Sequence, residues 1–128
     1  MSAERVKTTV NAYFAAIREL NVDAWLRTFA PDAVSHDPVG GTPLVGHPAL
    51  RAFFEAVAGG FRSIDIRGDQ IFVAGQSAAV KWTLHGVGKN GKHAAAEGID
   101  VFEFDDQGKI HRLFGYWDPA AMMAQLAG

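Results

Sequence analysis

The sequence predicts an α+β domain in which helices pack on one face of a curved antiparallel β-sheet. Apolar residues recur at spacings of three and four before Phe61, as on amphipathic helices, and at a spacing of two after it, as in half-buried strands. The chain has 128 residues, fewer than the roughly 150 of an average domain. We therefore expect one domain over residues 1–128, with helices first and a meander of strands afterwards.

Three helices are expected in the first half of the chain. Asn21 can cap the second helix, which is predicted to extend through Phe29 and to stop before Pro31. Pro48 suits the first turn of the third, and Gly59-Gly60 ends it. The predicted inward residues of the three helices are Val6, Val10, Tyr13, Ile17 and Leu20; then Val22, Trp25, Leu26 and Phe29; then Leu50, Phe53, Phe54 and Val57.

The strands follow from alternating apolar residues after Phe61. Asn90-Gly91 is a strong hairpin signal, and the return strand would place Asp100 on the same face as Phe102. A last strand through Tyr116-Trp117 would lead into a short helix capped by Asp118. The earlier strands are expected to turn inward Ile64, Ile66, Ile71, Val73, Val80, Trp82 and Leu84.

Charge and composition exclude several classes of protein. Twelve Lys and Arg residues against fourteen Asp and Glu residues give a net charge of −2, without the basic stripe that nucleic-acid binding requires. Lys7 and Arg18 interrupt the first apolar segment, so no signal peptide or membrane span is predicted. Cysteine is absent and the histidines form no helical i, i+4 pair, so no metal site is predicted. We expect a cytoplasmic protein without a cofactor.

Three polar residues stand out on this apolar background. Asp100 would be costly to bury as an anion, and no Lys or Arg lies two residues away on its face, so it is expected to be protonated unless a bulge places it in water. Tyr13 lies on an inward stripe, where it is either a donor or a core tyrosine bonded to a carbonyl. Asp37 precedes Pro38 in a glycine-rich loop and is either a base or a turn residue.

Together these residues describe a base and two hydrogen-bond donors around an apolar cavity. The cavity walls are predicted from apolar stripes that face the same interior. Those candidates for substrate binding are Trp25, Phe53, Phe54, Val80, Trp82, Phe102, Leu113 and Trp117.

Three parts of the chain resemble the Δ5-3-ketosteroid isomerases, within the SnoaL-like and nuclear transport factor 2-like superfamily. They are Tyr13, the segment His36-Asp37-Pro38-Val39-Gly40 and the segment Gly98-Ile99-Asp100-Val101-Phe102. The resemblance implies a cone-like fold, a small hydrophobic substrate such as a 3-ketosteroid, and a homodimer formed through the outer sheet face. It also implies that Asp37 is the general base and that Tyr13 and protonated Asp100 donate to the steroid ketone oxygen.

The chain departs from the family pattern at four positions. Phe29 and Phe54 stand where some members have tyrosines that support the oxyanion tyrosine, so that chain of hydroxyl groups is expected to be missing. His36 replaces a frequently acidic residue, and Glu97 adds a carboxylate on the strand face opposite Asp100.

Two other functions stay open: another enzyme on this scaffold, such as a polyketide cyclase, dehydratase or epoxide hydrolase, or a non-catalytic binder of a hydrophobic ligand.

Overall fold

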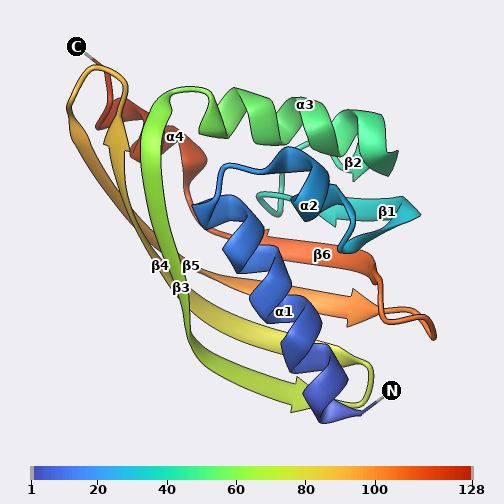
Figure 1. Cartoon of the computed structure of the whole chain (residues 1–128). Helices are drawn as coiled ribbons and strands as arrows, with labels where there is room; N and C mark the ends of the chain where they lie inside the picture. Colours follow the sequence, from blue (N-terminus) through green and yellow to red (C-terminus); the bar gives the residue numbers. More distant parts are fainter. Residues whose placement is uncertain (1, 128) are drawn as a thin grey trace.

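The computed structural model describes residues 2–127, which form helices on the hollow side of a curved sheet (Figure 1). This is the predicted α+β class. In chain order the elements are α1 (Ala3–Arg18), α2 (Val22–Leu26), β1 (Phe29–His36), β2 (Leu44–Val45), α3 (Gly46–Ala58), β3 (Phe61–Ala74), β4 (Ser77–Gly88), β5 (His93–Phe104), β6 (Ile110–Tyr116) and α4 (Pro119–Ala124).

The strands make a single sheet in the order β2-β1-β6-β5-β4-β3. Neighbouring strands are antiparallel except β1 and β6, which are parallel. Helices α1, α2 and α3 lie in the hollow of the sheet, and α4 packs near the start of β5 (Figure 1). Since a sheet buries its apolar face against helices, the core lies in this hollow.

Three of the predicted signals at the ends of elements are confirmed. The Asn21 side chain accepts a hydrogen bond from the Ala24 N–H at the start of α2. Asp118 does the same for the Ala121 N–H of α4. Asn90-Gly91 lies in the hairpin between β4 and β5, where Gly91 has a φ of +83°. No helix among the described residues is long and apolar enough to cross a membrane.

The second helix is shorter than predicted. It ends at Leu26, and the Thr28 hydroxyl donates to the Trp25 carbonyl at 2.7 Å. Phe29 therefore starts strand β1, where it pairs with Ile110 of β6. The apolar spacing at positions 22, 25, 26 and 29 fits a helix. The conformation of Phe29 is instead determined by pairing with a strand some 80 residues later. Local periodicity contains no information about such a pairing.

Pro31 lies inside β1. The prediction that it follows the end of the second helix is therefore wrong. The β1–β6 pairing is irregular between Phe29 and Val34, and β2 pairs only with Val34 and Ser35. No ladder hydrogen bond is therefore required from the Pro31 nitrogen. Strands β1 and β2 lie in the part of the chain where only helices and loops were expected.

The apolar segments on either side of Gly68-Asp69 belong to one continuous strand, β3. Its register with β4 shifts between Gly68 and Gln70, as at a β-bulge. The bulge increases the bend of this long strand around α1, whose Val6, Val10 and Tyr13 are buried against the sheet. This bend helps to form the hollow that contains the site.

Candidate active site

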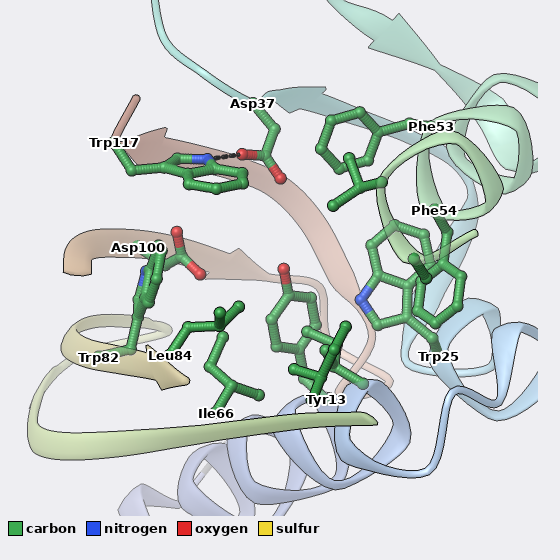
Figure 2. A pocket seen from close by; sticks show the side chains of 14 residues that line it. Tyr13, Trp25, Asp37, Phe53, Phe54, Ile66, Trp82, Leu84, Asp100 and Trp117 are labelled. Carbon is green, nitrogen blue, oxygen red and sulfur yellow. Dashed lines mark hydrogen bonds between the residues drawn. The ribbon is translucent and has the colours of Figure 1, made fainter. Parts of the chain in front are cut away.

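A cavity lies between the helices and the concave face of the sheet (Figure 2). The empty space inside it, including the open mouth, is about 540 Å³. The described lining is mainly apolar, and its ionisable side chains are those of Tyr13, Asp37 and Asp100. Figure 2 shows all three turning their oxygen atoms into the same space. The structure thus brings together the three residues singled out in the sequence.

Tyr13 is held by the buried face of α1, and only 3% of it is exposed. Its ring packs edge-on against Phe14 and Phe102, and its hydroxyl points into the cavity (Figure 2). Burial raises the pKa of Tyr13 well above its usual value, and the nearby Asp100 and Asp37 carboxylates raise it further. The hydroxyl therefore stays protonated and can donate a hydrogen bond to a bound ligand.

Asp100 points inward from the middle of β5 and is 4% exposed. It pairs in regular register with Val80 on one side and Gly115 on the other, so no bulge turns it toward water. None of the ion pairs among the described residues includes it. Burial raises its pKa well above the usual value, as does the charge of Asp37. Both effects favour the protonated carboxyl group, which can donate a hydrogen bond.

Asp37 follows the last residue of β1, on the opposite wall from Tyr13. The parallel pairing of His36 with Phe114 brings it beside β6. The Trp117 indole N–H donates to Asp37 Oδ1 at 2.5 Å. Burial raises the pKa of Asp37 to about 6, while the Trp117 hydrogen bond opposes the rise. Asp37 is thus ionised at neutral pH yet basic enough to accept a proton, which is what a general base requires.

Gly115 leaves the space in which the two carboxyl groups approach each other. A Cβ atom added there would lie 2.6 Å from Asp37 Oδ1 and 3.3 Å from Asp100 Oδ1. Real Cβ atoms essentially never show a contact as short as the first distance, so a side chain at this position would displace the Asp37 carboxyl group. Gly115 does not stand out in the sequence, because its role depends on the pairing of β6 with both β1 and β5.

Five of the predicted wall residues line the cavity: Trp25, Phe53, Phe54, Trp82 and Trp117. The other three, Val80, Phe102 and Leu113, do not, and each is completely buried in the core. They lie one layer deeper than expected. Phe102, for example, packs beneath the Tyr13 ring at a centroid distance of 5.1 Å. Inward alternation identifies the buried face of a strand but does not separate the cavity wall from the layer behind it.

Further apolar wall residues were missed as cavity residues. In the helices they lie one turn beyond a residue that was predicted to face inward, Tyr13, Phe53 or Phe54. In the strands they lie on the face that was predicted to be buried. They are Ile17, Val57, Ala58, Ile64, Ile66 and Leu84. Phe29 and Phe54 stand where some ketosteroid isomerases have tyrosines. Phe54 lines the cavity, and Phe29 is in the core. Neither side chain carries a hydroxyl group, so neither can support Tyr13.

The chain matches the SnoaL-like domain family over residues 10–113. It belongs to this family. The steroid Delta-isomerase of Nocardioides simplex is 33% identical to it over 123 residues, which are 96% of this chain and 97% of the relative. The predicted resemblance to the ketosteroid isomerases is thereby confirmed.

Several solved structures have the same fold as this chain. The Δ5-3-ketosteroid isomerase from a Mycobacterium species superimposes with a TM-score of 0.79 at 26% identity, covering 89% of this chain and 93% of that one. SalBIII, described as an epoxide hydrolase/cyclase-like enzyme in pyran ring formation of salinomycin, gives a TM-score of 0.81 at 26% identity, covering 90% and 92%. A nuclear transport factor 2-like protein from Burkholderia pseudomallei gives a TM-score of 0.82 at 21% identity, covering 100% of both chains. The nuclear transport factor 2-like fold is therefore confirmed, and proteins with different chemistry share it.

Proposed function

We propose that this SnoaL-like protein is a cofactor-independent steroid Δ-isomerase, which moves a C=C bond from Δ5 to Δ4 of a 3-ketosteroid. The single observation that carries the proposal is the pairing of two buried carboxyl groups with different acidities in one apolar cavity. Asp37 has a pKa of about 6, whereas Asp100 has a pKa raised well above its usual value. A base and an acid are thus available together at neutral pH.

Each polar group has a role in the proposed reaction. Asp37 takes a proton from the carbon between the ketone and the double bond and returns it two carbons further along. Tyr13 and Asp100 donate hydrogen bonds to the ketone oxygen while it carries the negative charge of the dienolate. Donors preorganised in a water-poor site stabilise such charge strongly, since they need no reorganisation when it develops. The apolar walls suit a flat hydrocarbon skeleton, and Tyr13, Asp37 and Asp100 would contact one region of that ligand.

The experiment is a spectroscopic assay of the purified protein with a Δ5-3-ketosteroid, following the absorbance of the conjugated enone. Asp37→Asn keeps an acceptor for the Trp117 N–H but removes the base. We expect isomerisation by the wild type and a decrease of about a hundredfold or more in the variant. A folded wild type that binds steroid but isomerises it no faster than buffer would contradict the proposal, as would full activity of Asp37→Asn.

The similarity to SalBIII supports a second candidate function, opening or cyclisation of an epoxide. Protonated Asp100 or Tyr13 could donate to the epoxide oxygen while Asp37 activates the attacking hydroxyl group. Product analysis after incubation with a hydroxy-epoxide distinguishes the two functions. Conversion of that substrate, together with no enone formation from the steroid, would favour the second function.

A further inference from the structure

Two indole N–H groups in the cavity wall are buried without a hydrogen-bond partner among the described residues. They belong to Trp25 and Trp82, which are 2% and 3% exposed. The remaining tryptophan of the chain, Trp117, uses its N–H on the proposed base, Asp37. A buried donor without an acceptor destabilises a protein, so two of them in one cavity call for an explanation.

Trp25 lies next to the first proposed donor. Its ring centroid is 5.9 Å from that of Tyr13, and Figure 2 shows its nitrogen directed toward the Tyr13 hydroxyl. The N–H is close enough to oppose the rise in the pKa of Tyr13, although the pair does not meet hydrogen-bond geometry. Phe29 and Phe54 surround the same indole with ring centroids at 4.8 and 5.0 Å and offer no polar atom. Trp25 is thus the wall donor directed at Tyr13.

Trp82 has the corresponding position beside the second donor. It pairs across β4 and β5 with Gly98, two residues before Asp100 on the same face. A Cβ atom at Gly98 would lie 2.8 Å from the indole Cζ2, so the absence of a side chain lets the ring lie over β5 toward Asp100. The N–H lies close enough to oppose the rise in the pKa of Asp100, again without hydrogen-bond geometry.

We propose that Trp25 and Trp82 are positioning residues whose indole N–H groups donate to the Tyr13 and Asp100 oxygens, one tryptophan for each oxyanion donor. The proposal deepens and rests on the proposed function, because it concerns the same donors. When the O–H group of Tyr13 or Asp100 donates a hydrogen bond to a ligand oxygen, the oxygen atom of that O–H group gains partial negative charge. An N–H bonded to that oxygen then strengthens the O–H donor, as in other hydrogen-bond chains. Two indoles would therefore supply the support that Phe29 and Phe54 cannot.

The test uses Trp25→Phe and Trp82→Phe, which remove the N–H and keep an aromatic ring. The first probe is 4-nitrophenol, whose absorbance reports whether the bound molecule is ionised. The second is 4-nitroanisole, which has nearly the same shape and no ionisable proton. We expect each variant to bind the phenolate about fivefold more weakly, the effect of one hydrogen bond, and to bind the anisole as the wild type does. Phe72→Leu changes an exposed aromatic residue outside the cavity and should leave the binding of both probes unchanged.

Double variants separate this role from direct contact with the ligand. If Trp25 acts through Tyr13, then Trp25→Phe has no further effect on phenolate binding in a Tyr13→Phe background. Likewise, if Trp82 acts through Asp100, then Trp82→Phe has no further effect on phenolate binding in an Asp100→Asn background. An undiminished effect in these backgrounds, or an equal loss of both probes in the single variants, would overturn the proposal.

The steroid assay gives a second measurement that can fail independently. If the protein is a steroid isomerase, each Trp→Phe variant should decrease kcat about fivefold with little change in KM. A wild type without isomerase activity would reject the proposed function, while the binding of 4-nitrophenol would still decide whether the indoles support Tyr13 and Asp100.

Discussion

Desolvation sets the chemical state of the polar side chains in the cavity. Asp37 and Asp100 have the same side chain, and burial is the largest cause of the raised pKa of each. They differ in their surroundings, because Asp37 accepts the Trp117 hydrogen bond and Asp100 also faces the Asp37 charge. Two buried carboxyl groups near each other do not readily ionise together, so ionisation of Asp37 favours the protonated form of Asp100.

A pH dependence follows from the Asp37 carboxyl group. The base must be ionised to accept a proton, so kcat/KM should be constant above about pH 6 and fall about tenfold per pH unit below it, following the pKa of about 6. Trp117→Phe removes a hydrogen bond that lowers this pKa, so its profile should shift to higher pH. Rate profiles from pH 4 to 8 test both statements. A midpoint near the usual carboxyl value of 3.8 would contradict the assigned base.

The sequence was sufficient to predict the inward direction of Tyr13 and Asp100. Both lie in regular elements whose period fixes the direction of each side chain, and the structure has them on those faces. The hydrogen bond between Asp37 and Trp117 could not be predicted in this way, because it joins residues 80 positions apart. Periodicity contains no information about which distant segments pair.

At the scale of elements, β6 is the strand that organises the site. It lies between β1, which leads to the base, and β5, which carries Asp100. The sequence predicted β5 and β6 but not β1, because the residues of β1 include a proline and continue a helical spacing from α2. The error is physical: tertiary pairing overrides local propensity when a segment supports both.

Gly115 of β6 supplies a prediction at this scale. In Gly115→Ala the new Cβ must push away Asp37 Oδ1, which would lie 2.6 Å from it. A small displacement of a base has a large effect on rate, so we expect kcat to fall at least tenfold. The matched control is Gly60→Ala, whose Cβ would meet nothing closer than 3.8 Å. Steady-state kinetics and urea unfolding of both variants are the measurements. Wild-type kcat in Gly115→Ala would show that the base tolerates the side chain.

For the whole molecule, we propose association through the outer face of the sheet, as the family resemblance implies. Ile99 and Tyr116 pair on neighbouring strands, and 44% and 53% of their surfaces are exposed. They flank Asp100 and Gly115 along the chain, so the same strands that carry the site on the inner face carry apolar side chains on the outer face. Covering these side chains in a second copy would remove apolar surface from water.

The expected species in solution is a dimer of the 13.8 kDa chain. Ile99→Glu introduces a charge into the proposed interface and should shift the protein toward monomer, since an unpaired buried charge is unfavourable. Val45→Glu is the control, because Val45 is 63% exposed on β2, at the sheet edge farthest from β3. Sedimentation equilibrium measures the mass of each. A monomeric wild type, or a dimer unaffected by Ile99→Glu, would reject this interface.

The parallel pairing of β1 with β6 also has a consequence for how the site forms during synthesis. A nascent chain that stops before Ile110 already contains Tyr13, Asp37 and Asp100, yet it lacks strand β6, which pairs with the strand that leads to Asp37. Contacts between such distant segments form late, because closing the intervening chain has a large entropic cost. The position of Asp37 would therefore be fixed only after β6 has been synthesised and has joined the sheet.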